Sequence, residues 1–407
     1  MTTRRIVFVC HTAAGESLRS ARAIAKLDNV EMCLVTGVHD TQQLIDAARA
    51  YGNVHKIVTT HETLLLPVAE ANEALGLVAM SSDTVKRTLD KSRLKATLKR
   101  AGVSTPRAQI VTTLADAQRF ADEVGFPIVI KPSAGSGALT TFQAHNEAQL
   151  ANVFDLLPRP LIAETFIRGQ ELCFDTITID NEPQFYSICE YNPSIINALR
   201  DPERQWQCVM PREIDDKHRE FIAQGLAAVR ALEVGNAMTH MEGFIDANGD
   251  AWFTDATLRP AGARIAPMLA FAYDIDPYHA WARVAVDGSF DGPWERKYAV
   301  GTIFLRGVGA GTVQRVEGIE RVQREFKDLL VDARWPRLEA RKSVTYTGDG
   351  FVTVRHRETD AVHDALLEIA RLVDITYSSG SQPATETWGS RLQNFRELNR
   401  PAWDQAN

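Results

Sequence analysis

The sequence predicts an α/β protein built from several parts, and three observations support this fold class. Short apolar runs alternate with amphipathic stretches over residues 1–84, which predicts a parallel sheet covered by helices. The middle of the chain carries longer alternating segments joined by turn sequences, which predicts antiparallel hairpins. After Gly288 the pattern changes to strands followed by a helix, which predicts a third α+β unit.

The N-terminal part is expected to alternate regularly between strand and helix. The predicted strands are 6–10, 31–36 and 55–59, and the predicted helices are 16–27, 41–51 and 64–75. No GxGxxG motif occurs there, so the sequence does not support the usual dinucleotide-binding loop.

The central and C-terminal parts are expected to mix helices with short strands. The predicted helices are 85–100, 114–124, 216–233 and 359–373. The predicted strands are 128–131, 161–166, 171–180, 183–191, 298–305, 341–346 and 351–356. Residues 379–407 are polar and lack periodicity, which predicts a surface tail.

Composition limits the kinds of partner to expect. A net charge of −7 argues against non-specific nucleic-acid binding, and no apolar run approaches the ~20 residues of a membrane span. The five cysteines are widely spaced and form no CxxC pair, so neither a zinc site nor a disulfide framework is predicted. We therefore expect a cytoplasmic protein, with a homodimer left open.

The most informative segment is a predicted hairpin around Asn248-Gly249, a strong turn signal. The hairpin sets Glu242 on one strand near Asp255 on the other. Neighbouring carboxylates repel and usually share a cation or a proton, and Arg259 follows at the end of the hairpin. The pattern favours a Mg²⁺ site beside phosphate oxygens, although an exposed hairpin with ordinary surface charges is the alternative.

A second group of residues has the chemistry of a polyphosphate site. Lys131 ends an apolar strand and is followed by Pro132 and a Gly/Ser loop, whose backbone N–H groups can bind anionic oxygens together with the lysine. Lys91 on the preceding basic helix is a further candidate. The sequence contains no Walker A motif, and solvated lysines beside a surface turn remain the alternative.

A third group could hold a nucleoside. Glu164 and the backbone near Phe166 and Ile167 could bind adenine, and Glu171 could accept hydrogen bonds from ribose hydroxyls. A bulged strand with two solvated carboxylates is the alternative.

Together these pieces resemble the ATP-grasp superfamily, in its order and at its spacings. The matching pieces are Asp90-Lys91, the exit from the helix at Gly102 and Pro106, Phe-Pro-Ile-Val-Ile-Lys-Pro at 126–132, the Gly/Ser loop, Glu-x-Phe-Ile-x-Gly-x-Glu at 164–171, and the hairpin ending in Arg-Pro-x-Gly at 259–262. The resemblance spans about residues 1–290, and the C-terminal part looks like the closing domain of the same enzymes.

The resemblance implies a division of the chain. It implies a Rossmann-like pre-ATP-grasp domain at 1–84, a nucleotide-binding subdomain at 85–190, a metal and substrate subdomain at 191–290, an α+β lid domain at 291–378 and a polar tail at 379–407.

The resemblance also implies roles for individual residues. Lys91, Lys131 and the loop Ala134, Gly135, Ser136, Gly137 and Ala138 would bind phosphates, while Glu164, Phe166 and Ile167 would hold adenine and Glu171 ribose. Glu242 and Asp255 would hold Mg²⁺, for which Mn²⁺ could substitute. Arg259 and Lys131 would be catalytic. His240, Thr257, Arg264 and Gly309 are the candidates for contact with substrate.

The chain departs from the superfamily pattern at two metal positions. Asp255 stands where Glu is usual, and Thr257 stands where Asn is usual. A hydroxyl is a weaker Mg²⁺ ligand than an amide oxygen, so the number of metal ions is in doubt.

The activity implied is that of a carboxylate–amine ligase. ATP would convert a small carboxylate into an acyl phosphate, and an amine would attack it to form an amide, with release of ADP and phosphate. The chain looks most like the L-amino acid ligases that make dipeptides or small amide natural products. Another ATP-grasp carboxylase or purine-type ligase, and an ATP-binding protein without catalysis, are the alternatives.

Overall fold

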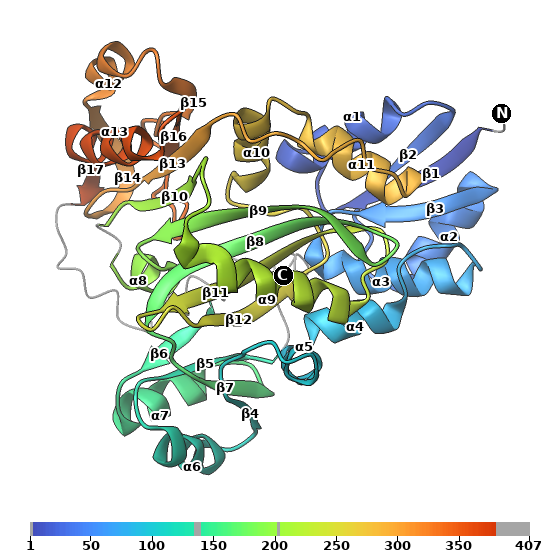
Figure 1. The fold of residues 1–407 in the computed structure, drawn as a ribbon, viewed down its shortest axis with the longest axis horizontal. Helices are drawn as coiled ribbons and strands as arrows, with labels where there is room; N and C mark the ends of the chain where they lie inside the picture. Colours follow the sequence, from blue (N-terminus) through green and yellow to red (C-terminus); the bar gives the residue numbers. More distant parts are fainter. Residues whose placement is uncertain (1–2, 134–139, 202–203, 380–407) are drawn as a thin grey trace, which may run out of the picture.

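The computed structural model describes residues 3–133, 140–201 and 204–379. The N-terminal part forms a three-stranded parallel sheet in the order β2-β1-β3 (Figure 1). Its elements are β1 (Arg4–Cys10), α1 (Gly15–Ala25), β2 (Val30–Thr36), α2 (Thr41–Tyr51), β3 (Val54–Thr59) and α3 (Glu62–Ala74). The middle strand is buried from Ile6 to Cys10, as expected for a parallel strand covered on both faces.

The predicted helix 85–100 is in fact two helices, α4 (Ser82–Leu89) and α5 (Lys91–Arg100). Asp90 separates them, because its backbone is extended and its carboxylate accepts hydrogen bonds from the backbone N–H groups of Ser92 and Arg93. An aspartate in this position is a favourable N-cap. The break places Lys91 in the first turn of α5.

A four-stranded antiparallel sheet in the order β4-β7-β5-β6 forms the lower lobe in Figure 1. Two helices on one side of this sheet bury Phe120 and Phe154 against it. The elements are β4 (Ala108–Val111), α6 (Leu114–Val124), β5 (Ile128–Pro132), β6 (Phe142–Ala144), α7 (Glu147–Leu156) and β7 (Leu161–Thr165).

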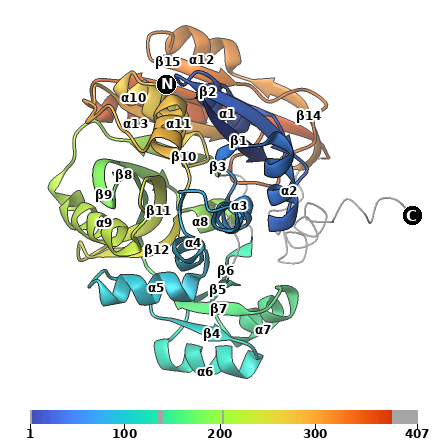
Figure 2. The same ribbon diagram turned by 90° about the vertical axis from the view of Figure 1, so that its right-hand side faces the viewer.

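The centre of the molecule is an eight-stranded sheet in the order β12-β11-β8-β9-β10-β13-β16-β15. Helix α9 covers one face of this sheet, and α10 and α11 cover the other (Figures 1 and 2). Side chains alternate along its strands, so Leu172 and Phe174 pack in the core with α9, and Cys173 and Ile177 pack in the core with α10 and α11. The central elements are β8 (Gly169–Ile179), β9 (Glu182–Asn192), α8 (Ile195–Arg200), β10 (Trp206–Met210), η2 (Asp216–His218), α9 (Arg219–Leu232), β11 (Ala237–Asp246), β12 (Ala251–Thr257), α10 (Ile265–Tyr273) and α11 (Pro277–Asp287).

The C-terminal strands extend this same sheet. The sheet is continuous across residues 190 and 290, while the domain boundaries given above remain predictions. The C-terminal elements are β13 (Ala299–Leu305), β14 (Ala310–Glu317), α12 (Ile319–Glu325), β15 (Leu330–Arg334), β16 (Gly350–His356), α13 (Thr359–Leu372) and β17 (Asp374–Ser379), of which β14 and β17 form a separate two-stranded sheet.

One predicted strand, 341–346, is wrong. Only Arg341 forms an isolated bridge, to Thr312. The following side chains hydrogen-bond locally, with Thr345 Oγ1 2.7 Å from Thr347 Oγ1 and Ser343 N donating to Asp349 Oδ1 at 2.7 Å. Such local bonds compete with the pairing of a strand.

Within the described ranges, no helix combines the length and apolar character needed to cross a membrane.

Candidate active site

A pocket of about 190 Å³ lies where the four-stranded sheet meets strands β11 and β12 of the central sheet. Glu62 from α3 and Tyr346 from the C-terminal part complete its wall. The pocket brings together most of the residues singled out in the sequence. They are Lys91, Lys131, Glu164, Phe166, Ile167, Glu171, His240, Glu242, Asp255, Thr257 and Arg259.

The phosphate-binding candidates converge on one carboxylate. Lys91 Nζ lies 2.8 Å from Asp255 Oδ1, and Lys131 Nζ lies 2.8 Å from Asp255 Oδ2. The two lysines hold the pKa of Asp255 well below its ordinary value, although burial acts in the opposite direction. Burial would lower the pKa of Lys131, but Asp255 and Glu164 raise it. The four side chains therefore form a charged cluster at the join of the two sheets.

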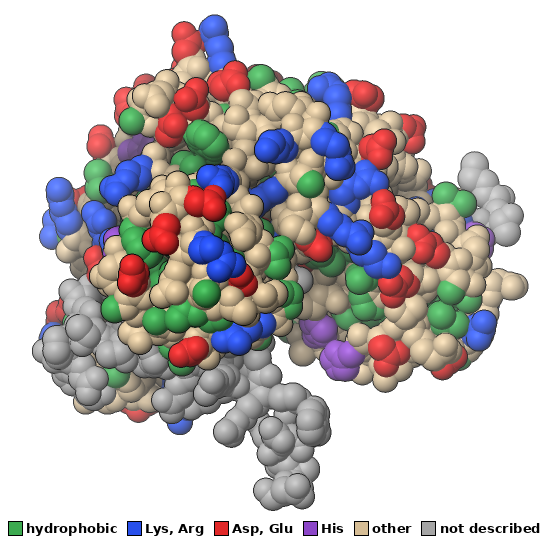
Figure 3. Space-filling model, turned by 90° about the horizontal axis from the view of Figure 1, so that it is seen from below, with side chains coloured by type: hydrophobic (Ala, Val, Ile, Leu, Met, Phe, Trp, Pro, Cys, Tyr) green, Lys and Arg blue, Asp and Glu red, His purple; other side chains and the backbone are tan. Residues whose placement is uncertain are grey.

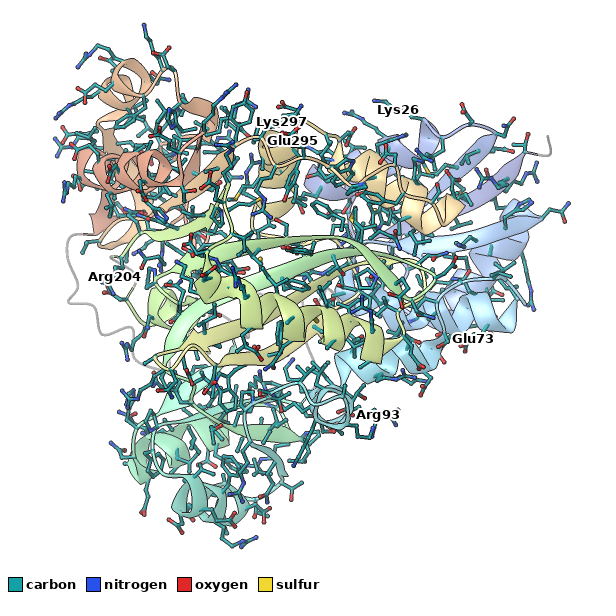
Figure 4. The ribbon with its side chains drawn as sticks, in the orientation of Figure 1. Lys26, Glu73, Arg93, Arg204, Glu295 and Lys297 are labelled. Carbon is teal, nitrogen blue, oxygen red and sulfur yellow. The ribbon has the colours of Figure 1, made fainter. Side chains whose placement is uncertain are left out.

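A fifth side chain, Lys95, joins this cluster, and sequence reasoning missed it. This buried lysine lies 3.1 Å from Glu164 Oε1, while Lys131 lies 3.3 Å from Glu164 Oε2. Burial lowers the pKa of Lys95, which Glu164 partly opposes. The available signal was its spacing, because Lys95 follows Lys91 by four residues and so shares its face of α5. Arg93, between them, lies on the outer side of this helix (Figure 4).

Glu164 has a different environment from the one its predicted role suggests. Its carboxylate pairs with the two lysines, and it is 2 % exposed. Phe166 and Ile167, just beyond β7, line the pocket with Val129. An apolar wall beside the lysines of the charged cluster suits a flat, apolar group attached to an anion. The adenine contacts themselves stay a prediction.

The paired carboxylates occupy the predicted hairpin. Glu242 and Asp255 are directly opposite each other on β11 and β12, and a register shift follows between Glu242 and Gly243. Both side chains are 30 % exposed. Carboxylate oxygens on one wall of an open pocket are the ligands that Mg²⁺ prefers, so the residues fit such an ion. Thr257, opposite His240, adds a hydroxyl nearby.

Glu171 lies deeper on the same face. Its Oε2 accepts a hydrogen bond from the Ile195 backbone N–H at 2.6 Å. Burial, together with the nearby Glu242, raises the pKa of Glu171 to about 8. This carboxyl therefore binds a proton more readily than an ordinary glutamate, which lets it act as a hydrogen-bond donor as well as an acceptor.

Arg259 is held by a residue of the N-terminal part. Its Nη2 lies 2.9 Å from Glu62 Oε2, and its Nη1 donates to the Pro260 carbonyl at 2.9 Å. The guanidinium is 22 % exposed and lines the pocket near the paired carboxylates. Glu62 is a site residue that sequence reasoning missed, since it lies 197 positions away in the chain.

Other predicted site residues lie elsewhere. Arg264 pairs with Asp332 and stacks over the Phe351 ring at 3.9 Å, and Gly309 accepts a hydrogen bond from Lys342 Nζ at 2.8 Å. Neither is among the residues that line the pocket, so their contact with substrate stays a prediction. The loop at 134–138 falls outside the described residues. Ser133 is the last described residue before this loop, and its carbonyl accepts a hydrogen bond from the Lys91 backbone N–H at 3.2 Å.

The face of the molecule that lies at the bottom of Figure 1 carries charges of both signs. Figure 3 shows Lys and Arg side chains interspersed with Asp and Glu over this face.

Comparison with known proteins gives a consistent assignment. The family model of the carbamoyl-phosphate synthase L chain ATP-binding domain matches residues 90–160. An alanine–anticapsin ligase of Bacillus subtilis is 27 % identical over 246 residues, which are 55 % of this chain and 52 % of that protein. An L-arginine-specific L-amino acid ligase of the same species is 22 % identical over 58 % of each chain. The present chain thus spans little more than half the length of these relatives.

Solved structures extend the likeness to nearly the whole chain. An L-amino acid ligase from Bacillus licheniformis superposes with a TM-score of 0.72 at 18 % identity, covering 93 % of this chain and 100 % of that one. An N5-carboxyaminoimidazole ribonucleotide synthetase from Thermotoga maritima gives 0.69 at 16 % identity, covering 92 % and 100 %. The structural likeness shows the fold, and the matched segment and the sequence relatives bear out the resemblance to ATP-grasp ligases.

Proposed function

We propose that this protein is an ATP-dependent ligase that joins a small carboxylate, an amino acid, to an amine. One observation carries the proposal: two lysines, an opposed pair of carboxylates and an arginine line a single pocket. These groups suit a phosphoryl transfer, in which charge develops on oxygen atoms and must be offset by fixed positive groups. The similarity to amino acid ligases supports the choice of carboxylate.

The charge arrangement supports a clamp on ATP. Lys91 and Lys131 are paired with Asp255 here. On binding of nucleotide and cation, the lysines would turn to phosphate oxygens and Asp255 would turn to the cation. Glu242 and Asp255 would hold Mg²⁺ or Mn²⁺, which supplies charge neutralisation on the β- and γ-phosphates. The adenine would lie along Phe166 and Ile167, with the ribose near Glu171.

Arg259 is suited to act on the second reactant. A guanidinium binds a carboxylate or an acyl phosphate through two parallel hydrogen bonds. Its ion pair with Glu62 keeps the side chain aimed at the pocket. We propose that Arg259 orients the carboxylate for attack on the γ-phosphate and then stabilises the oxyanion formed when the amine attacks. The carboxylate oxygen leaves with the phosphate, the amine nitrogen replaces it on the acyl carbon, and the amine loses one proton as the amide forms.

The test is a turnover assay with isotope-labelled carboxylate. The protein, ATP and Mg²⁺ are incubated with amino acids singly and in pairs, and ADP and amide products are measured. We expect ADP release that requires both reactants, transfer of ¹⁸O from the carboxylate to phosphate, and a hydroxamate when hydroxylamine replaces the amine. Release of AMP and pyrophosphate would contradict the mechanism. Turnover that requires bicarbonate would favour a carboxylase instead.

One observation favours a second candidate, an ATP-binding protein without turnover. Asp255 has a shorter side chain than the glutamate usual there and already pairs with two lysines. This would weaken metal binding. Such a protein would bind ATP in calorimetry yet release no ADP with any reactant pair.

The cysteines support a proposal for the cellular setting. The five thiols Cys10, Cys33, Cys173, Cys189 and Cys208 are unpaired, as expected in a reducing compartment. We therefore propose a cytoplasmic enzyme acting on small molecules. Light scattering of the purified protein tests whether two copies form a homodimer.

A further inference from the structure

A buried polar chain runs from the interior of the central sheet to the pocket. His240 and Asp175 are directly opposite each other on β11 and β8. His240 Nδ1 lies 2.8 Å from Asp175 Oδ1, and Cys173 Sγ donates to Asp175 Oδ2 at 3.1 Å. His240, Asp175 and Cys173 are 9 %, 6 % and 0 % exposed. Both oxygens of the aspartate are therefore occupied.

The other end of the imidazole faces the site. His240 lines the pocket, and its Nε2 lies 3.6 Å from Glu242 Oε1. A carboxylate can only accept hydrogen bonds, so Asp175 keeps a proton on Nδ1 and fixes the plane of the ring. With Nδ1 occupied, Nε2 is the ring atom left to meet the reacting groups.

We infer that Asp175 is a positioning residue for the ligase reaction, which orients His240 so that its Nε2 meets the reacting groups beside Glu242. The inference rests on the proposed function. Asp175 itself does not line the pocket, so it acts through His240. Partners of this kind fix the tautomer and orientation of a working histidine, and their removal costs about 10–100-fold in activity.

Cys173, Asp175 and His240 could have two other roles, and each predicts a different experimental result. A stabilising polar contact in the core would, on its loss, lower stability and leave the catalytic constant of the folded protein unchanged. A metal site is the second role, because the ligand atoms of Cys173, Asp175 and His240 all lie within 4.8 Å of one another. That site would bind zinc in stoichiometric amount.

The experiment compares Asp175→Asn, His240→Asn and the double variant. An asparagine at 175 keeps the shape but can offer an N–H to Nδ1, which moves the ring proton to Nε2. An asparagine at 240 can still donate to Asp175 but does not reach the pocket. We expect each single variant to lose about 10–100-fold in kcat with KM for ATP nearly unchanged, and the double variant to lose no more than His240→Asn alone. Ser187→Ala is the matched control, because Ser187 faces Asp175 from the other neighbouring strand and is also buried.

An additional measurement needs no turnover. Nitrogen-15 spectra of the wild-type protein, with the His240 signals identified by their loss in His240→Asn, should show a protonated Nδ1. Four results would each overturn the inference. In the kinetics they are nearly full kcat in folded Asp175→Asn, or additive losses in the double variant. In the binding and spectral data they are an unprotonated Nδ1 of His240, or stoichiometric zinc that is lost in Cys173→Ala. If the wild type turns over no substrate pair, the proposed function fails, while the spectra still decide whether Asp175 orients His240.

Discussion

Lys131 and Asp255 join the two sheets that form the pocket: Lys131 Nζ on β5 donates to Asp255 Oδ2 on β12 at 2.8 Å. Lys131 belongs to the four-stranded sheet and Asp255 to the central sheet. A polyphosphate would compete with Asp255 for the lysine, and a cation would compete with the lysine for Asp255. The ion pair therefore has the right chemistry to open when ATP and a metal bind together.

Loss of the lysine charge should weaken nucleotide binding. Lys131→Met keeps most of the side-chain length but removes a charge-assisted contact worth about 1.5–3 kcal/mol. We expect a Kd for ATP raised by about 10–100-fold in calorimetry. Lys86→Met is the control, since Lys86 pairs with Glu70 away from the pocket. An unchanged Kd in folded Lys131→Met would reject the phosphate role.

The two hairpin carboxylates should control the metal requirement. Glu242→Gln and Asp255→Asn each remove one anionic ligand, so the Mg²⁺ concentration that half-saturates turnover should rise, or turnover should vanish. Asp255→Asn should also bind ATP at least as tightly as the wild type in the absence of metal, because it removes the negative charge that competes with the phosphates for Lys91 and Lys131. Glu295→Gln serves as an exposed control. Equal Mg²⁺ titrations in all four proteins would exclude this site.

Removal of the arginine should affect chemistry more than nucleotide binding. Arg259→Ala should lower kcat by on the order of 10²–10³, the usual effect of losing one stabiliser of a developing oxyanion, with little change in ATP affinity. Arg93→Ala is the matched control, since Arg93 lies on the outer side of α5 (Figure 4). A comparable loss of ATP affinity would instead make Arg259 a nucleotide ligand.

Glu190 should make stability depend on pH in the acid range. Burial would raise its pKa, but His218 and Lys217 lower it to about 2. A carboxylate with a depressed folded-state pKa adds stability that is complete above its unfolded value, near ~4.3, and is lost as pH falls through the folded value. The contribution is up to about 3 kcal/mol. Urea unfolding of the wild type and Glu190→Gln should differ most above pH 5 and converge toward pH 2. A difference independent of pH would contradict this assignment.

The local pattern of the sequence was sufficient for several elements of the fold and site. Apolar spacing predicted the helix Thr41–Tyr51 at its observed bounds, and the Asn248-Gly249 turn predicted the register that sets Glu242 opposite Asp255. Both features depend on residues close together in the chain. The ATP-grasp resemblance and the α/β fold class were likewise confirmed, because the motifs that carry them are short and ordered.

Elements that depend on distant partners were missed or misread. The sequence predicted a third, C-terminal α+β unit but not how it is attached: β13 pairs with β10 and so joins the central sheet. Strand β10 itself was not predicted. Alternation of apolar and polar residues shows that a segment can be a strand and which of its faces is buried. The pattern does not say which other strand supplies its hydrogen bonds.

The sequence by itself determined the class of chemistry: which side chains can bind phosphate, metal and nucleoside, and which turn brings two carboxylates together. Only the tertiary structure decided how these groups are paired. Three pairs join residues of different elements: Lys95 with Glu164, Glu62 with Arg259, and Asp175 with His240. The physical reason is that charge pairing and burial depend on distance in space, and the packing of the sheets brings together residues whose separation in the chain carries no such signal.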